Sequence, residues 1–583
     1  MKVDPVTLEV VMGALTYIAE EMGIALRNSA YSPNIKERMD HSCAIFDPER
    51  RLVAQAEHIP VHLGSMSYAV KMGLEHFREA LGDGDMILFN DPYYSGTHLP
   101  DMTLIAPVYH EGELVAYVAN KAHHSDVGGK TPGSLAGDAT ELFQEGIIIP
   151  PVKFVKAGEI DGELAELILS NVRTPKITMG DLRAQIAANN LGARRILELV
   201  EKYGVKRLHS AMEAVMDYSE RRMRAEIGRM PEGSYEAEDY LEDTGVSDKP
   251  VKIKVKITIK GTDITFDYTG TDPQVEGPVN APLGVTISGI YFTLICVTDP
   301  TIPINDGCYR PVSVIVPEGC LLNPRRPAPV AGGNVETSQR NVDVLLRAFA
   351  KIVPERVCAA GQGTMNNISV GGIDPETGRA WTFYETIAGG YGARLGMDGV
   401  DGIHVHMTNT MNTPIETIES YYPIRFLKYC LRRDSGGPGK WRGGCGIERS
   451  WMLLAPSATL SILAERSKIP PWGLFGGKPG APGEYLLIKS SGETIRLRSK
   501  CTVRMERGDI LVIRTPGGGG YGNPLERDPK LVLRDVLDGL VSLDSARRDY
   551  GVVIDPETTE LDLEATRKLR ENLSASERQM EGL

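Results

Sequence analysis

The feature that most constrains the fold is a stretch over residues 89–129 that predicts a long β-hairpin. Residues 103–109 (TLIAPVY) and 114–119 (LVAYVA) are apolar and rich in strand-forming residues, and the HEGE segment between them has turn composition. We expect the turn to centre between Glu111 and Gly112. The stretch therefore predicts two antiparallel strands joined by a turn.

Histidine and aspartate side chains collect where this hairpin opens. With the turn at that position, Asp101 faces His123 within one register step, and their α-carbons lie about 5 Å apart. His98 stands three residues before Asp101 in a loop that can fold over the hairpin mouth, and His124 and Asp126 follow His123 closely. Imidazole nitrogen and carboxylate oxygen suit zinc, manganese or iron(II). The alternative is that these residues are strand caps or hydrogen-bonded core residues.

Other histidines and acidic residues of the first part of the chain are further candidates for this group. Asp40 lies at the entrance of a strand predicted over residues 42–47, where a turn or cap role is the alternative. His58 and His62 flank a proline in an apolar loop and could be ordinary packing residues. Eight of the eleven histidines lie at or before His124, so we expect the chemistry in this part of the chain.

Two glutamates follow the hairpin in a loop-rich segment over residues 128–146. Glu141 and Glu145 lie on a short stretch that is predicted to be helical. Either carboxyl group could act as a general acid or base near the hairpin mouth. The alternative is that both lie on a solvated helix face.

Composition narrows the class of protein. The 583 residues are enough for about three or four domains. A net charge of −13 and the lack of a Lys/Arg-rich block argue against a nucleic-acid partner. The eight cysteines contain no C-x-x-C pair and are interpreted as free thiols in a reducing cytosol. No apolar leader or membrane-spanning run is present, so we expect a soluble, cytoplasmic protein without membrane contact.

The order of helical and alternating patterns indicates where domains meet. Asp4 and Pro5 begin a long N-terminal helix with one apolar stripe. A helical pair is predicted to end near residue 230. Residues 251–260 (VKIKVKITIK) then alternate strictly and form a hairpin with residues 263–268. We therefore place a domain boundary near residue 230.

Several polar loops follow this boundary. Residues 332–340 are a glycine turn before a helix, whose N-terminus either binds an anion or simply closes the turn. His404 and His406 are predicted to alternate on a strand and so to point to the same face. They could be substrate-pocket residues, a hydrogen-bonded pair or a second metal half-site. The glycine-rich segment 434–444 is no P-loop, because Trp441 stands where Ser or Thr must follow Gly-Lys.

These patterns together predict a multidomain α+β protein with β-rich mixed sheets, peripheral helices and a long N-terminal helix. Residues 1–230 are expected to form a metal-binding catalytic domain. Residues 231–430 are expected to form a β-rich α+β domain with possible substrate-pocket loops. Residues 431–583 are expected to form a β-rich module with a helical C-terminal tail.

Long motifs across the chain resemble the B-type subunit of ATP-dependent hydantoinases and 5-oxoprolinases. The resemblance covers nearly the whole chain. It is carried by residues 34–47 (NIKERMDHSCAIFD), 54–66 (AQAEHIPVHLGSM), 90–101, 120–128, 332–340, 404–419, 434–446 and 515–524.

The resemblance implies a division of labour between two subunits. A partner A-type ATPase subunit would phosphorylate the carbonyl oxygen of a hydantoin, 5-oxoproline or lactam ring. The B-type subunit would then cleave the activated ring at a centre holding zinc or manganese, with iron as a third choice. ATP would be used by the partner, in agreement with the lack of a P-loop here.

The resemblance also implies roles for individual residues. His124 and Asp126 are assigned to supporting the ligands or to proton transfer, and Asp126 or Glu145 would protonate the departing nitrogen. The family's metal ligands match Asp40, His98, Asp101 and His123, of which the hairpin argument selects the last three.

Three alternatives stay open. The same architecture occurs in subunits of acetone- and acetophenone-type carboxylases, although those tend to be longer. A non-catalytic scaffold for the ATPase subunit would carry no stoichiometric metal. A self-sufficient metallohydrolase would act without ATP.

Overall fold

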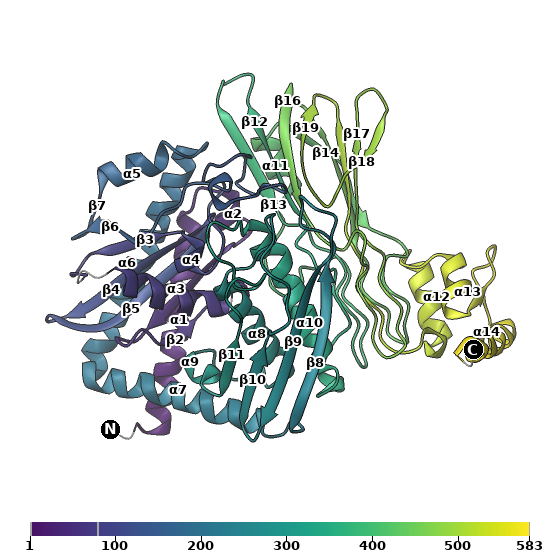
Figure 1. The fold of residues 1–583 in the computed structure, drawn as a ribbon, viewed down its shortest axis with the longest axis horizontal. Helices are drawn as coiled ribbons and strands as arrows, with labels where there is room; N and C mark the ends of the chain where they lie inside the picture. The colour runs from purple at the N-terminus through teal and green to yellow at the C-terminus, as the bar shows by residue number, and fades with distance from the viewer. Residues whose placement is uncertain (1–2, 57, 78–80, 582–583) are drawn as a thin grey trace.

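The computed structural model describes residues 3–56, 58–77 and 81–581, and its fold is α+β, as the sequence predicts (Figure 1). Among these residues the strands form sheets of seven, four, four, five and two strands. The seven-stranded sheet lies at the left of Figure 1, the first four-stranded sheet at the lower centre, and the remaining large sheets at the upper right.

The N-terminal sheet is antiparallel throughout, with strand order β2-β1-β5-β4-β3-β6-β7. Two long helices, α1 (Pro5–Ser29) and α6 (Pro175–Tyr203), pack on one face, and α3 (His62–His76) covers the other. The strands are β1 (His41–Phe46), β2 (Leu52–Gln55), β3 (Met86–Phe89), β4 (Asp101–His110), β5 (Glu113–His123), β6 (Val152–Lys156) and β7 (Glu159–Ile160).

Helix α1 begins as predicted. The Asp4 carboxylate accepts a hydrogen bond from the Thr7 amide, and Pro5 occupies the first turn. Its apolar stripe, which includes Leu15 and Met22, is buried against α6 and the sheet. Helix α6 is followed by α7 (Val205–Ile227), and Gly204 between them has a φ of 74°, which favours glycine.

The middle of the chain forms a second layered unit. The predicted hairpin of β9 (Val251–Lys260) and β10 (Asp263–Asp267) is confirmed. Strand β8 (Gly233–Leu241) pairs with β9, and β11 (Val312–Ile315) pairs in parallel with β10. This sheet packs on α8 (Leu283–Val297) and α10 (Ser338–Phe349), and a π-helical turn at Gly333–Thr337 leads into α10.

The last third contains two sheets whose apolar faces share one core. Strand β12 pairs with β13 on one side and with β16 on the other, so this sheet extends across the domain division that the sequence placed at residue 430. The first sheet contains β12 (Asn367–Ile373), β13 (Ala380–Glu385), β16 (Ser457–Leu463) and β19 (Lys500–Glu506). The second contains β14 (Ile424–Leu431), β15 (Ile447–Leu453), β17 (Glu484–Ile488), β18 (Thr494–Arg496) and β20 (Ile510–Arg514).

The glycine-rich segments pack backbone against backbone beside these sheets. The Gly518 amide donates to the Gly444 carbonyl, and the Gly437 amide donates to the Gly518 carbonyl. A Cβ on Gly518 would lie 2.0 Å from the carbonyl oxygen of Tyr391. These contacts require glycine, because a side chain at such positions would meet the opposing backbone.

A small helical unit ends the chain, at the far right of Figure 1. It comprises α12 (Pro529–Leu537), α13 (Leu543–Tyr550), the short strands β21 (Val553–Ile554) and β22 (Leu561–Asp562), and α14 (Leu563–Glu581). Residues 582 and 583 of the predicted tail lie outside the described residues. None of the helices that the structure describes has the length and apolar character needed to cross a bilayer.

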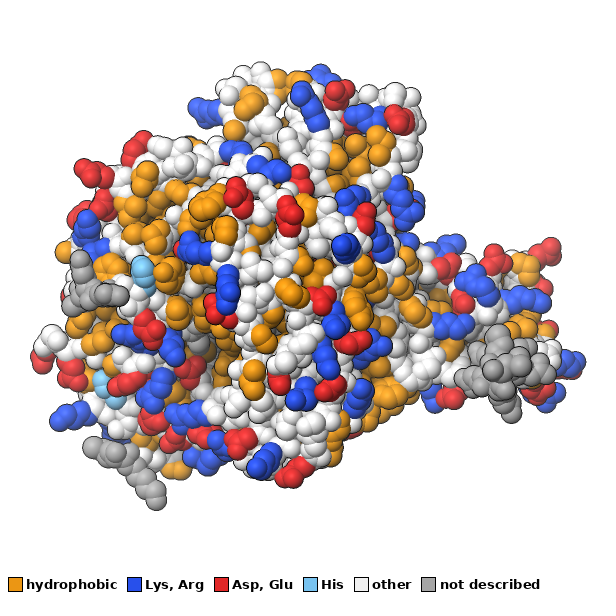
Figure 2. Space-filling view, viewed as in Figure 1, with side chains coloured by type: hydrophobic (Ala, Val, Ile, Leu, Met, Phe, Trp, Pro, Cys, Tyr) orange, Lys and Arg blue, Asp and Glu red, His pale blue; other side chains and the backbone are white. Residues whose placement is uncertain are grey.

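Acidic and basic side chains are interspersed over the molecular face shown in Figure 2, with apolar side chains between them. The eight cysteines are free, as predicted, and five of them are buried.

Candidate metal centre

Asp101 and His123 face each other at the open end of the β4–β5 hairpin. Asp101 is the first residue of β4, His123 is the last residue of β5, and the two are register partners, as the sequence predicts. His98 lies in the loop before β4, and its Nε2 is 3.4 Å from Asp101 Oδ2. One ligand atom from each of these three side chains falls within 4.8 Å of the others. The hairpin therefore brings together the three residues selected from its sequence.

The loop that carries His98 is held from several sides. The short helix α4 (Pro92–Ser95) ends at Gly96, which has a left-handed φ of 72°. The Asn90 side chain donates to the Leu99 carbonyl at 2.8 Å. Lys121, on β5, donates to the Ser95 carbonyl at 2.7 Å. These bonds fix the entry and exit of the loop, so His98 is presented to Asp101 by backbone geometry.

The three side chains are 1–2% exposed, yet several of their polar atoms have no hydrogen-bond partner. Both ring nitrogens of His98, Nε2 of His123 and Oδ2 of Asp101 are in this state. An unpaired buried polar atom costs about 1–3 kcal/mol, so native proteins seldom leave several together. A divalent metal would satisfy them, because two imidazoles and a carboxylate are the donor set that zinc, manganese and iron accept.

The protonation states of the cluster also suit a metal. Burial raises the pKa of Asp101, but the electrostatic effect of the adjacent His98 and His62 rings outweighs it and holds that pKa well below its usual range. Burial lowers the pKa of His123 well below its usual range. An ionised carboxylate and a neutral imidazole are the forms that bind metal.

Asp40 lies beside the cluster, although its carboxylate is not among the three converging groups. Its carbonyl accepts the backbone N–H of His123, and its side chain lines the same small cavity. The carboxylate lies 3.7 Å from the Arg38 guanidinium, which stacks on the Tyr384 ring at 4.6 Å. Burial raises the pKa of Asp40.

His62 is a site residue that the sequence interpretation missed. It begins α3, its Nδ1 is 2.9 Å from the Ser42 hydroxyl, and its Nε2 is 3.6 Å from Asp101 Oδ2. Its role therefore extends beyond packing in the apolar loop, because it contacts a member of the cluster. Nothing local could have revealed it, because 38 residues separate it from Asp101 and only the fold of α3 on the sheet joins them.

Two further contacts to His123 come from distant parts of the chain. The ring of Tyr384 on β13 stacks on the His123 ring, with 4.6 Å between centroids and 6° between planes. Asn34 Nδ2 lies 3.3 Å from His123 Nδ1. Because Nδ1 has this partner, Nε2 is the nitrogen directed at the cluster.

His124, Asp126 and Glu145 do not line the cavity beside the cluster. The His124 ring is directed at α6, where its Nε2 lies 3.0 Å from Gln185 Oε1. Successive strand residues alternate faces, so His124 necessarily turns away from the side that His123 faces.

Asp126 and Glu145 bind backbone and loop groups. The Asp126 carboxylate accepts hydrogen bonds from the Gly128, Gly133 and Arg173 amides and from the Arg173 guanidinium. The Glu145 carboxylate accepts hydrogen bonds from the amides of residues 330 and 331. Burial raises the pKa of Glu145 to about 7. Glu141 is exposed at the start of a short 3₁₀ turn.

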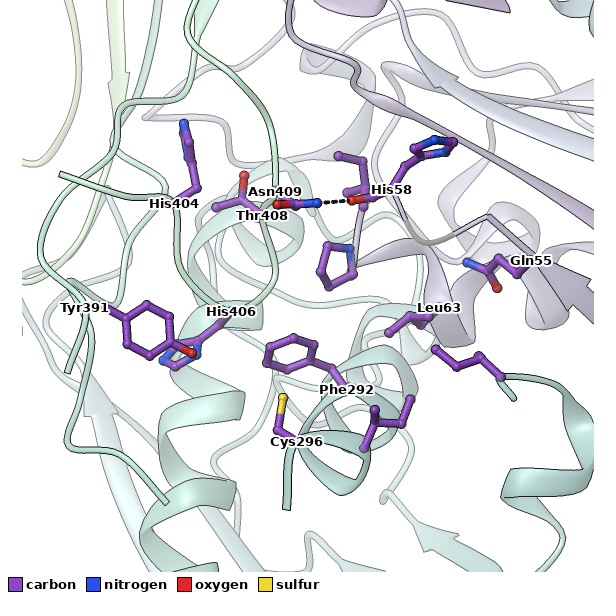
Figure 3. A pocket seen from close by; sticks show the side chains of 14 residues that line it. Gln55, His58, Leu63, Phe292, Cys296, Tyr391, His404, His406, Thr408 and Asn409 are labelled. Carbon is purple, nitrogen blue, oxygen red and sulfur yellow. Dashed lines mark hydrogen bonds between the residues drawn. The ribbon is translucent and has the colours of Figure 1, made fainter. Parts of the chain in front are cut away.

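A larger cleft of about 310 Å³ adjoins the small cavity and shares Ile59 and Thr408 with it (Figure 3). His404 and His406 both line this cleft, but the prediction that they alternate on a strand was wrong. The chain is irregular there, His406 has a left-handed φ of 50°, and the two rings point away from each other. His406 Nε2 lies 3.3 Å from Asp343 Oδ1.

The fold and the buried pair of histidines with one aspartate define an α+β protein with a candidate metal centre. A family model described as Hydantoinase B/oxoprolinase matches residues 4–524. The chain therefore belongs to the hydantoinase B/oxoprolinase family.

Relatives match over most or all of this chain. An uncharacterised protein of Methanocaldococcus jannaschii is 51% identical, covering 97% of this chain and 100% of that protein. The B-type subunit of a putative D-/L-hydantoinase from a Pseudomonas species is 38% identical, covering 98% of both. A 5-oxoprolinase of Dictyostelium discoideum is 39% identical over 89% of this chain, which spans only 40% of that protein's length.

Solved structures share the fold. The ATP-dependent caprolactamase of Pseudomonas jessenii superposes with a TM-score of 0.91 at 33% identity, covering 98% of this chain and 100% of that one. A nucleotide-free acetone carboxylase superposes with a TM-score of 0.92 at 22% identity, covering 99% and 84%. At that identity the second likeness shows the fold alone.

Proposed function

We propose that this chain is the metal-dependent B-type subunit of an ATP-dependent enzyme that opens cyclic amide rings. The observation that carries the proposal is the convergence of unpaired donor atoms from His98, Asp101 and His123 in one buried cluster. Family membership and the names of two relatives, a putative hydantoinase and a caprolactamase, support the substrate class.

In the proposed reaction, an A-type ATPase subunit phosphorylates the carbonyl oxygen of the ring before this chain acts. A ring amide has a poorly electrophilic carbonyl and a poor leaving nitrogen, and activation by ATP lowers both barriers. The hydantoinase relative is itself named as one subunit of its enzyme, which supports a two-chain arrangement. The Dictyostelium relative, of which this chain spans 40%, has room for a further large unit in the same polypeptide.

The chain would hold the metal through His98, Asp101 and His123, with Asp40 beside them. Zinc or manganese, or iron as a third choice, would act there as a Lewis acid and lower the pKa of a water molecule. The chain's own contribution is orientation. Asn34 sets which nitrogen of His123 faces the cluster.

Proton transfer to the departing nitrogen is not assigned to Asp126 in this proposal, because its carboxylate is occupied by four donors. Glu145 has the pKa of a proton donor, at about 7, but its oxygens bind two backbone amides. We place Asp126 and Glu145 as supports of the loops around the cluster, and His124 as a contact to α6.

Metal analysis of the purified chain tests the proposal. We expect about one divalent ion per chain in the wild type and loss of that ion in His98→Ala and His123→Ala. The matched control is His110→Ala, a half-exposed histidine at the other end of β4. With the A-type partner and ATP, both site variants should lose ring opening while the control keeps it.

Other outcomes would point to the alternative functions. Full ring opening after removal of the metal by a chelator would contradict the proposed mechanism. A metal-free wild type that only binds the ATPase subunit would indicate a scaffold, and ring opening without ATP would indicate a self-sufficient hydrolase. Carboxylated product from a ketone and bicarbonate would indicate a carboxylase.

A further inference from the structure

The cleft beside the candidate metal centre is formed where three parts of the chain meet. Helix α8 contributes Phe292 and Ile295, the loop before α3 contributes Ile59 and Pro60, and residues 404–409 close the other side (Figure 3). Because the cleft and the small cavity share Ile59 and Thr408, a ring in the cleft lies next to the cluster. The volume, about 310 Å³, is at the lower end of the range for small-ligand pockets.

The described residues that line the cleft include no lysine, arginine, aspartate or glutamate. The described residues that line the small cavity include no lysine or arginine, and the only acidic residues among them are Asp40 and Asp101. The guanidinium of Arg38, which lies 3.7 Å from the Asp40 carboxylate, is fully buried. It is already engaged by the Tyr384 carbonyl and ring and by the Thr386 hydroxyl.

The histidines of the cleft do not supply the free positive charge that a lysine or arginine would provide. His58 and His406 each face a carboxylate, since Glu20 lies 3.6 Å from His58 and Asp343 lies 3.3 Å from His406. His404 has no carboxylate beside it among the described residues, and burial lowers its pKa to about 3, so its ring is neutral near pH 7. The described lining of the cleft therefore has no cation that a bound carboxylate could pair with.

The cleft does offer uncharged polar groups, among them the Gln55 amide, the Thr408 hydroxyl and the Asn409 amide. Gln55, the last residue of β2, is 4% exposed, and its Oε1 has no hydrogen-bond partner among the described residues. Its amide points toward the cleft in Figure 3. A side-chain amide can pair with an uncharged ring amide through one donor and one acceptor, but it supplies no charge to offset a carboxylate.

We propose that the cleft receives the ring of a cyclic amide whose own substituents are uncharged, a lactam or an alkyl-substituted hydantoin, and discriminates against rings that carry a carboxylate, such as 5-oxoproline. This inference rests on the proposed function. Burying a carboxylate without a partner is costly, whereas the methylenes of a neutral ring gain from contact with Phe292, Ile295 and Ile59.

The test compares kcat/KM for ε-caprolactam, 5,5-dimethylhydantoin and 5-oxoproline, using this chain with its A-type partner and ATP. We expect at least one neutral ring to exceed 5-oxoproline by at least about tenfold, the effect of 1.4 kcal/mol. Equal or better use of 5-oxoproline would overturn the inference and leave the proposed function standing. Failure to open any of these rings, with intact metal binding, would instead count against the proposed function.

A variant of this chain separates its own selectivity from that of the partner. Cys296 is an exposed cleft residue on α8, so Cys296→Arg places a cation at the cleft without burying it. We expect this variant to raise the ratio of 5-oxoproline to caprolactam use at least fivefold, and Cys296→Met, of similar reach and no charge, to leave the ratio unchanged. An unchanged ratio in Cys296→Arg would place the selectivity outside this cleft and overturn the inference.

Discussion

The imidazole of His62 lies 3.6 Å from the Asp101 carboxylate while its other nitrogen lies 2.9 Å from the Ser42 hydroxyl. Asp101 is thereby held between His62 and His98, whose Nε2 lies 3.4 Å from the same carboxylate oxygen. Groups that orient a metal ligand in this way typically change metal affinity by about 10–100-fold when they are removed.

His62→Leu is therefore expected to weaken metal binding by about tenfold or more, measured by competition with a chromogenic chelator. His62→Gln keeps a donor near Asp101 and should restore part of the affinity. The control is His76→Gln, at the exposed end of the same helix. Metal affinity within twofold of the wild type in His62→Leu would show that Asp101 does not depend on this contact.

Lys121 tests whether the loop before β4 presents His98. Its ammonium group donates to the Ser95 carbonyl and the Thr97 hydroxyl, and it is fully buried. Lys121→Met should cost about 1–3 kcal/mol in the free energy of unfolding and weaken metal binding, because the two acceptors lose their donor. Lys156→Met, at an exposed position on β6, should change neither quantity. Unaltered metal binding in Lys121→Met would show that this contact is not needed to position His98 for the metal.

The close backbone packing of the glycine-rich segments predicts that an added side chain there lowers the free energy of unfolding. Gly518→Ala should lower the free energy of unfolding by about 1–3 kcal/mol or more, because the added methyl meets the Tyr391 carbonyl oxygen at 2.0 Å. Gly13→Ala is the control, since nothing lies within 4 Å of its added Cβ and alanine favours the helix. Denaturant unfolding of both variants measures this, and equal stability would contradict the packing.

Glu145 predicts a pH dependence of stability. Burial raises its pKa from the ordinary 4.5 to about 7, so the unfolded chain releases this proton at lower pH than the folded chain. Stability from this group is therefore greatest below pH 4.5 and falls by about 3 kcal/mol as pH rises to 7. Glu145→Gln does not titrate, so its stability relative to wild type should improve by about 2 kcal/mol between pH 5 and 7.5. Urea unfolding across this range measures it, and a constant difference would contradict the shifted pKa.

The hairpin is the part of the site that local sequence determined. Two apolar strands and one turn fix a register, and that register alone places Asp101 opposite His123. His98 follows because only two residues separate it from Asp101. The α+β class, the start of α1 and the β9–β10 hairpin were predicted for the same reason, since each depends on short-range periodicity or capping.

Tertiary structure decided which distant groups surround these three residues. His62 and Tyr384 reach the cluster from α3 and β13, and no local pattern encodes that approach. The same holds for His406, whose left-handed backbone and contact with Asp343 replaced the strand that alternation suggested. Periodicity records which face of one element is buried, whereas the groups that meet across elements depend on how whole layers pack.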